Sequence, residues 1–131
     1  MGQSLWTFEG FRTANGNGVV QEWFWGEIDD EGRDAIRDRV TYLALLERHL
    51  WKEPHFKRLD SDLGEIRTKT SRGALRVYGF FRIAHHFLFL SANYKSVNND
   101  RVGKNAAKDR LKRFRQGLGD FHEFDFEDRH D

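Results

Sequence analysis

Three strand-like runs lie close together in the middle of the chain, at residues 63–70, 74–82 and 86–94. Together they are rich in the β-branched and aromatic residues that favour strands. The first gap is short and contains Gly73, and the second gap is only residues 83–85. Because links this short join neighbouring antiparallel strands, the sequence predicts an antiparallel meander.

Side chains alternate between the two faces of a strand, and this sorts the cations of the first two runs. In 74–82 the apolar set that includes Leu75 and Val77 is expected to face covering helices. The open face then carries Arg67, Lys69, Arg76 and Tyr78. Such a face is either an ordinary solvated surface or a surface that holds phosphate. Alternation alone leaves both interpretations open.

The segments before the meander are expected to supply one strand and a long helix. Residues 4–12 mix aromatic and polar residues as strands do, whereas residues 19–25 fit either a strand or a short amphipathic helix. The pair Asp29–Asp30 can cap a helix, and Pro54 cannot continue one, so the helix is predicted at about 30–51. Its apolar stripe, expected in the core, is Ile36, Val40, Leu43, Leu46 and Leu50.

A second helix and an acidic tail are expected after the meander. Asn99 or Asp100 can cap this helix, predicted at about 100–116, and Gly117 suits its C-terminal end. Residues 117–131 contain three phenylalanines and six acidic side chains, and they fit a final strand or a docked peptide. The helix carries an apolar stripe of Val102, Ala106, Ala107, Leu111 and Phe114.

Composition limits the class of protein. The chain has 131 residues, enough for one domain, and its 12 Phe and 4 Trp can build a core. It has no cysteine, which suits a reducing cytoplasm, and neither a signal peptide nor a membrane span is expected. Residues 57–82 carry 7 basic and 3 acidic side chains, and residues 95–116 carry 8 and 2, between two acidic ends. This asymmetry points to an anionic partner.

The order of these segments, from about residue 4 to 116, resembles toxins of the RelE/ParE superfamily, nearest to the HigB-like, phage-derived branch. Residues 19–24, VVQEWF, are similar to a short helix of that branch. Residues 63–81, LGEIRTKTSRGALRVYGFF, are similar to the family's strand, turn and strand. Residues 91–96, SANYKS, precede a helix as they do in the family.

The resemblance implies a fold and a division of the chain. The fold is α+β and RelE-like: an antiparallel sheet of about four strands, with N-terminal helices packed on one face and a C-terminal helix. The toxin domain is expected at residues 1–116, and residues 117–131 form an acidic, aromatic C-terminal tail.

The resemblance also implies an activity. It is that of an mRNA interferase of a type II toxin–antitoxin system, an endoribonuclease that cleaves message on the ribosome and is neutralised by an antitoxin protein. A ribose 2′-hydroxyl attacks its own 3′-phosphate, with no metal or other cofactor. A base takes the 2′ proton, cations stabilise the phosphorane, and an acid protonates the leaving 5′ oxygen. The expected partners are the cognate antitoxin, mRNA and the ribosome, with no membrane, in the cytoplasm.

The residue types of the open face suit these roles. Arg67 and Arg76 are expected to clamp phosphate, because an arginine fork meets two phosphate oxygens at once. Lys69 and Lys95 are expected as secondary phosphate contacts, and Tyr94 as a stacking platform or proton donor. Further RNA contacts are expected at Arg72, Tyr78, Lys104 and Lys108. The cations of the 100–116 helix fit either a solvated face or a contact with ribosomal RNA.

The general base stays open at this point. Glu65, His85 and His86 are candidates, but Glu65 also suits an ion pair with Arg67, and the histidines suit turn or packing roles. A metal site is not expected, because adjacent histidines in an extended strand point to opposite faces. The acidic tail is also a candidate cover for the basic face when RNA is absent.

An alternative function uses the same fold without chemistry. A RelE/ParE-like module can bind a protein target of the gyrase type, or nucleic acid, without cleaving RNA. Inhibition of gyrase with intact message would favour this alternative over the endoribonuclease.

Overall fold

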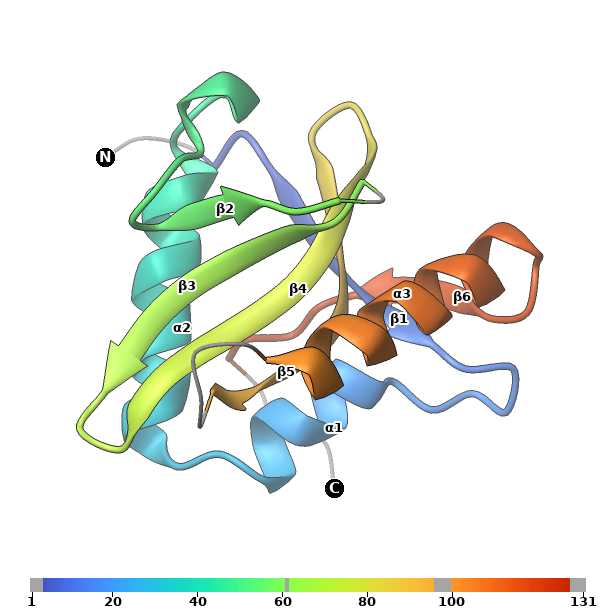
Figure 1. Ribbon diagram of the computed structural model, residues 1–131, viewed down its shortest axis with the longest axis horizontal. Helices are drawn as coiled ribbons and strands as arrows, with labels where there is room; N and C mark the ends of the chain where they lie inside the picture. Colours follow the sequence, from blue (N-terminus) through green and yellow to red (C-terminus); the bar gives the residue numbers. More distant parts are fainter. Residues whose placement is uncertain (1–3, 61, 96–99, 128–131) are drawn as a thin grey trace.

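The computed structural model describes residues 4–60, 62–95 and 100–127, which form one six-stranded mixed sheet with helices (Figure 1). The strands are β1 (Thr7–Arg12), β2 (Phe56–Arg58), β3 (Gly64–Thr70), β4 (Gly73–Ile83), β5 (His86–Lys95) and β6 (Asp120–Glu123). Their order in the sheet is β2-β3-β4-β5-β1-β6. β3, β4 and β5 are antiparallel neighbours, so the predicted meander is confirmed.

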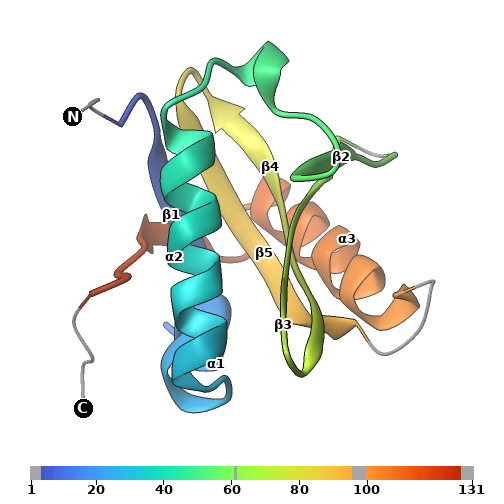
Figure 2. The ribbon, with the colours of Figure 1, turned by 90° about the vertical axis from the view of Figure 1, so that its left-hand side faces the viewer.

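Helices cover both faces of the sheet (Figure 2). They are α1 (Val19–Gly26), α2 (Asp30–Ala44), the short 3-10 helix η1 (Arg48–Leu50) and α3 (Arg101–Arg115). Leu75 and Val77 belong to the core under α1 and α2, and Leu88 and Leu90 belong to a second core under α3. The expected placement of the N-terminal helices on one face is confirmed, and the ambiguous segment 19–25 is helical.

The expectation of about four antiparallel strands is wrong in number and in direction. β2 and β6 add a strand at each edge, and β1 runs parallel to β5, with Phe8 opposite Phe87. β2 has three residues, of which only Phe56 is buried, so no alternating pattern marks it in the sequence. β1 can lie parallel to β5 because the long segment between them contains α1 and α2.

α2 begins as predicted and ends earlier than predicted. The Asp29 side chain accepts a hydrogen bond from the Gly32 amide at 2.9 Å, as a cap should. At the other end, the Trp51 indole N–H donates to the Leu43 carbonyl at 2.9 Å, and the Leu5 amide donates to the Ala44 carbonyl at 2.7 Å. These donors satisfy the last carbonyls, so the helix stops at Ala44. In the predicted stripe Ile36, Val40 and Leu43 are buried, Leu46 is half-buried, and Leu50 is exposed.

α3 also has the predicted cap. The Asp100 side chain accepts a hydrogen bond from the Gly103 amide at 3.1 Å, and Gly117 follows the helix with a φ of 77°. Ala107 and Leu111 are buried as predicted, but Val102 is 78% exposed. The first turn of α3 therefore makes its contact through Gly103, which is buried.

The acidic tail, as far as Glu127, belongs to the same sheet and core. β6 pairs antiparallel with β1, and Phe124 is buried among the residues under α1 and α2. Phe126 packs against the same core. A cover over the basic face is wrong for residues 117–127, because β6 lies at the edge of the sheet opposite β2. Residues 128–131 lie outside the described part of the chain.

None of the helices among the described residues is long and apolar enough to cross a lipid bilayer.

Candidate functional site

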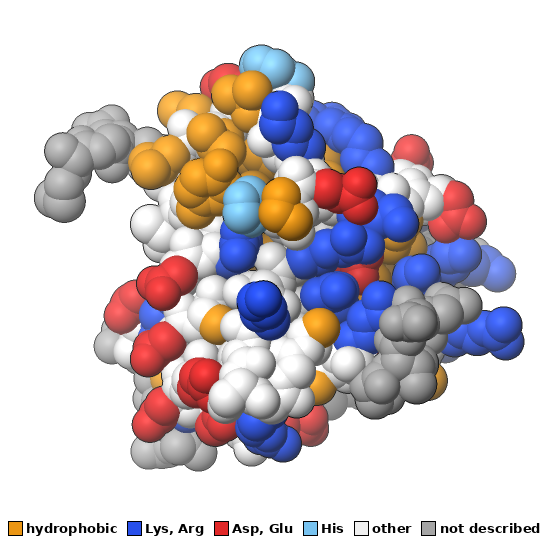
Figure 3. Space-filling view, turned by 60° about the vertical axis from the view of Figure 1, so that its left-hand side comes forward, with side chains coloured by type: hydrophobic (Ala, Val, Ile, Leu, Met, Phe, Trp, Pro, Cys, Tyr) orange, Lys and Arg blue, Asp and Glu red, His pale blue; other side chains and the backbone are white. Residues whose placement is uncertain are grey.

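The register of β3, β4 and β5 brings the predicted cations onto one face. Arg67 lies directly opposite Arg76, and Lys69 lies opposite Ala74. Ala74 in turn lies opposite Lys95 of β5, so the ends of the three strands present cations side by side. Figure 3 shows lysine and arginine side chains gathered on one part of the surface, with a few acidic side chains among them.

One buried carboxylate holds the two arginines. Glu65 is 2% exposed, and its Oε2 accepts hydrogen bonds from Nε and Nη2 of Arg67 at 3.2 and 3.1 Å. Its Oε1 lies 2.9 Å from Nε of Arg76. The expected ion pair between Glu65 and Arg67 is therefore present, and Arg76 shares it. One carboxylate therefore lies between two cations, and Lys69 and Lys95 add further positive charge to the same face.

Both arginines also reach the surface. The side chains of Arg67 and Arg76 are 21% and 14% exposed. Nη1 of Arg67 binds the exposed Glu53 at 3.1 Å, and Nη1 of Arg76 donates to the Leu75 carbonyl at 3.1 Å. The guanidinium groups are therefore held from below and accessible from outside, which is the arrangement that a phosphate clamp needs.

Lys95 stands at the end of β5 beside these arginines. Burial and the nearby charge of Arg76 lower its pKa, with smaller contributions from Arg67 and Lys104, while Glu65 acts in the opposite direction. A lysine in this setting gives up its proton more easily than a free lysine. Lys69 is exposed on the same face.

Tyr78 is not on an open face, and the expectation that it contacts RNA is wrong. It is 0% exposed, because α3 covers this part of the sheet. Its hydroxyl donates to Asp100 at 2.7 Å and lies 3.3 Å from Glu65. Burial, followed by the hydrogen bond to Asp100, raises the pKa of Tyr78, so the hydroxyl keeps its proton. Tyr78 thus joins the N-terminal cap of α3 to the carboxylate that holds Arg67 and Arg76.

Tyr94 and Arg72 lie on the opposite face. Tyr94 pairs with Leu75, which points toward α2, and its hydroxyl donates to Asp29 at 3.3 Å. The Arg72 guanidinium carbon lies 4.9 Å from the centre of the Tyr94 ring. The expectation that Tyr94 neighbours Arg76 on the cationic face is therefore wrong, and Arg72 accompanies Tyr94 rather than the clamp.

The two histidine candidates lie at the far end of β4. The His85 ring is 3.2 Å from Glu47, and Nδ1 of His86 is 2.9 Å from the buried Glu9. From Arg76 to the end of the strand at Ile83 is seven residues, or roughly 23 Å of extended chain. Neither histidine is within reach of a phosphate held by Arg76.

The two lysines of α3 that were expected to contact RNA, Lys104 and Lys108, differ in their surroundings. Lys104 is half-buried, and its charge lowers the pKa of Lys95, which places it beside the cationic face. Lys108 is one turn further along and lies 3.4 Å from Asp60. Only Lys104 extends the clamp.

A cavity opens beside the clamp and adds two residues that the sequence did not single out. It has a volume of about 380 Å³, and Arg67, Lys69 and Arg76 line one side of it. Arg39 of α2 and His55 line another side. Burial lowers the pKa of Arg39. In the sequence, Arg39 lies between Ile36 and Val40, which belong to the apolar stripe of its helix. A cation beside that stripe is the one sequence feature that could have indicated its place in the cavity.

A family comparison covers this part of the chain. The model of the family described as phage derived protein Gp49-like (DUF891) matches residues 23–114, more than half of the chain. The chain belongs to the Gp49-like family. This is a toxin-like family of the RelE type, in agreement with the resemblance at that coarser level. No curated protein matches the chain.

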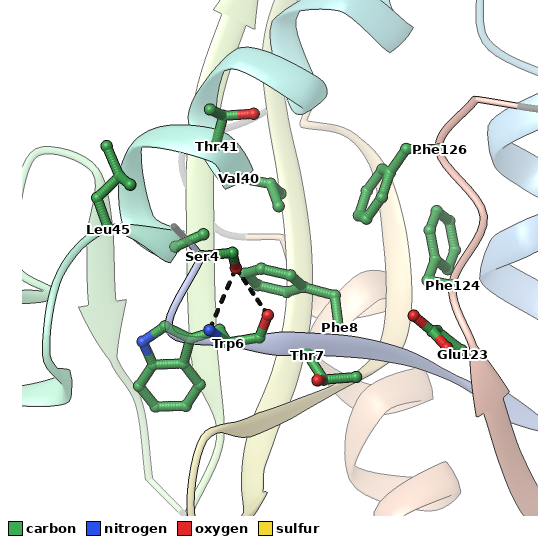
Figure 4. Close-up of a pocket in the computed structure, with 11 residues that line it drawn as sticks. Ser4, Trp6, Thr7, Phe8, Val40, Thr41, Leu45, Glu123, Phe124 and Phe126 are labelled. Carbon is green, nitrogen blue, oxygen red and sulfur yellow. Dashed lines mark hydrogen bonds between the residues drawn. The ribbon is translucent and has the colours of Figure 1, made fainter. Parts of the chain in front are cut away.

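The Gp49-like match includes every residue of the clamp and of the cavity beside it. It begins within α1 and ends near the C-terminus of α3, so β1 and β6 lie outside it. A second cavity, of about 350 Å³, is built partly from those outer segments (Figure 4). Its lining combines Trp6, Phe8, Phe124 and Phe126 with α2, and the one charged residue in it is Glu123. An aromatic cavity without a cation does not suit phosphate.

The described residues contain no group of three or more histidine, cysteine or acidic side chains that could hold a metal ion.

Proposed function

We propose that this Gp49-like chain is the toxin of a type II toxin–antitoxin system, of the HigB-like kind, and that it cleaves mRNA on the ribosome. The observation that carries the proposal is the pair of arginines, Arg67 and Arg76, opposed across β3 and β4 and tied to one buried carboxylate. This pair is accessible from outside and is accompanied by Lys69 and Lys95. Membership of a toxin-like family supports the same conclusion.

The proposed reaction moves one phosphoryl bond within the RNA. The 2′-oxygen gives its proton to a base and forms a bond to the adjacent phosphorus, while the bond from phosphorus to the 5′-oxygen breaks. The leaving 5′-oxygen takes up a proton from an acid or from water, so a 2′,3′-cyclic phosphate and a free 5′-hydroxyl result. Negative charge accumulates on the non-bridging oxygens in the transition state. Arg67 and Arg76 supply paired N–H donors for those oxygens, which is electrostatic stabilisation of the charge that develops.

Lys95 is the proposed general base. Both oxygens of Glu65 are engaged by arginines, and Tyr78 is buried with its proton retained, so neither suits this role. Burial and the charge of Arg76 lower the pKa of Lys95, so this side chain gives up its proton more easily than a free lysine does. A lysine that gives up its proton here accepts the 2′ proton beside the arginines that hold the phosphate.

The proposed partners follow from the same activity. A cognate antitoxin protein is expected to neutralise the toxin, and mRNA in the ribosomal A site is the expected substrate, in the cytoplasm. The alternative, a RelE/ParE-fold module that binds gyrase or another target without cleaving RNA, uses the same face without the chemistry.

The experiment is induction of the chain in a bacterial host, with growth and message integrity measured together. Wild type is expected to arrest growth and to produce cleaved messages, whereas Arg67→Ala and Arg76→Ala lose both effects. Arg12→Ala, which removes an arginine paired with Asp120 at the other end of the sheet, is the matched control and should stay toxic. Arrest with intact message and blocked supercoiling would overturn the proposal in favour of the gyrase-binding alternative.

A further inference from the structure

The cavity beside the clamp contains two polar groups that the proposed reaction does not use. These are Arg39 of α2 and His55, which precedes β2. Nε of Arg39 and Nδ1 of His55 are buried, and within residues 4–60, 62–95 and 100–127 neither has a hydrogen-bond partner. Buried polar groups are normally satisfied, so two side chains with an unpaired buried nitrogen on the lining of one cavity are unusual.

The backbone leaves the cavity open at this edge of the sheet. The pairing of β2 with β3 runs from Gly64 to Ile66, and the Arg67 amide donates to the His55 carbonyl at 2.9 Å. β3 continues to Thr70, beyond the end of that pairing. The cavity therefore lies where α2, the segment before β2 and the second half of β3 meet, and Figure 3 shows cationic side chains on this side of the molecule.

The charge of the cavity suits an anion. Its lining carries four positive charges, on Arg39, Lys69, Arg67 and Arg76. Glu65 offsets part of the charge of the two arginines of the clamp, and the exposed Glu53 offsets part of that of Arg67. Arg39 has no carboxylate within salt-bridge distance among the described residues. An ordinary ion pair therefore does not explain why a guanidinium is held in this cavity.

One ring, that of His55, lines the other side of the cavity. The His55 ring contacts the Tyr42 ring edge-on, with centroids 4.8 Å apart, and Tyr42 is 46% exposed. Pro54 lines the cavity beside His55. A flat ring next to a cationic site is typical of sites that stack an unpaired nucleobase and hold its phosphate. The volume of about 380 Å³ is in the range of small-ligand sites.

We propose that this cavity binds the nucleotide next to the scissile phosphate, with its phosphate on Arg39 and its base stacked on His55. The inference rests on the proposed function for the identity of the ligand as single-stranded RNA. It adds a subsite outside the reacting atoms, so Arg39 and His55 position the substrate and do not take part in bond making. Cleavage is then faster for messages whose flanking nucleotide fills the cavity.

The test measures binding without cleavage. The probe is a fluorescent six-nucleotide RNA with 2′-O-methyl groups, which lacks the attacking hydroxyl and cannot be cut. Anisotropy at several salt concentrations gives the affinity and the salt slope. Arg39→Ala is expected to weaken binding about tenfold, and to make the salt slope shallower by about 0.7, because one phosphate contact to a single strand is lost. His55→Ala is expected to weaken binding about fivefold with the slope unchanged, because a stacking contact is lost.

Two further measurements keep the outcome clear. NMR follows the ring signals of His55 in the wild-type protein during titration with the probe, and these signals should shift. Because the measurement uses only the wild-type protein, it does not depend on the folding of any variant. Arg12→Ala should bind within about twofold of wild type, because it removes the same charge at a distance. Affinities within twofold of wild type for both Arg39→Ala and His55→Ala, with unmoved His55 signals, would overturn the inference.

The outcomes also separate the two proposals. If the variants bind the probe weakly but the wild-type chain cleaves no message, the subsite stands and the endoribonuclease proposal fails. If the wild-type chain cleaves message and the variants bind the probe normally, the endoribonuclease proposal stands and the subsite fails. A hexaglutamate peptide that displaces the probe as well as unlabelled RNA does would show that the cavity takes carboxylates, as an acidic protein segment would supply, and would overturn the nucleotide assignment.

Discussion

Replacing Glu65 by glutamine is the most direct test of how the cationic face is held together. The Glu65 side chain is 2% exposed and accepts hydrogen bonds from Arg67. Its carboxylate also lies 2.9 Å from Nε of Arg76 and 3.3 Å from the Tyr78 hydroxyl. Glutamine keeps the shape and one acceptor oxygen but removes the charge. The two arginines then lose the carboxylate that balances them.

The size of the effect follows from burial. Removing one member of a buried ion pair costs about 3–5 kcal/mol. Here the arginines are 21% and 14% exposed, and the amide oxygen still accepts from one of them, so we expect a loss of about 2–3 kcal/mol. An unfolding entropy of about 2.1 cal/mol/K per residue gives about 0.28 kcal/mol/K for this chain, so Tm should fall by about 9 °C.

The assay combines denaturant unfolding with RNA cleavage and binding. The matched control is Glu53→Gln, which removes a carboxylate from the same arginine, Arg67, at a site that is 62% exposed. Its cost should stay below about 1 kcal/mol, as for exposed ion pairs. RNA affinity of Glu65→Gln should equal or exceed that of wild type, because a negative charge has left the face. If Glu65→Gln and Glu53→Gln are equally stable, Glu65 does not anchor the arginines. If folded Glu65→Gln loses more than about 100-fold in cleavage, Glu65 is the general base instead of Lys95.

Two further predictions concern Lys95 and Tyr78. Lys95→Arg keeps the charge and removes the base, so RNA binding should stay within about twofold while cleavage falls about 10²–10⁴-fold. Because the pKa of Lys95 is lowered, the wild-type cleavage rate should rise with pH and level off at a pH below the usual pKa of lysine. If the pH–rate profile of Lys95→Arg keeps this rise, Lys95 is not the base. Tyr78→Phe should lower the free energy of unfolding by about 1–3 kcal/mol, because Asp100 and Glu65 lose a hydrogen-bond donor, and it should leave RNA affinity unchanged. Calorimetry measures the stability, and the same binding assay measures the affinity. Weaker binding at unchanged stability would show that Tyr78 contacts RNA after all.

The meander and both helix caps could be predicted because each depends on neighbours in sequence. The alternation of side chains along the strands correctly placed Leu75 and Val77 on one face and Arg67 and Arg76 on the other. Asp29 caps α2, and Asp100, one of the two predicted caps of α3, caps that helix. The short edge strand β2 and the parallel neighbour of β5 depend on contacts between distant segments. A three-residue strand carries too little pattern to be seen in advance.

Two errors in the site have different physical origins. Alternation says which side chains share a face but not whether another element covers that face, so Tyr78 was expected in the open although α3 buries it. Tyr94 and Lys95 are adjacent in β5 and must point to opposite faces, and the register assigns Lys95 rather than Tyr94 to the face of Arg76. Arg39 joins the site across the edge of the sheet, which no pattern within one segment reports.

The buried chain from α3 to the clamp explains why a phosphate site contains a carboxylate. Asp100 caps α3 and accepts hydrogen bonds from the Tyr78 hydroxyl at 2.7 Å and from the Asn93 side-chain amide at 3.1 Å. The Tyr78 hydroxyl also lies 3.3 Å from Glu65. Two opposed arginines without Glu65 would repel each other on neighbouring strands. With Glu65 beneath them they are held at the surface, and the α3 cap fixes the tyrosine that steadies the carboxylate. A clamp built in this way keeps its geometry before the substrate arrives, so less of the binding energy is spent on ordering the arginines.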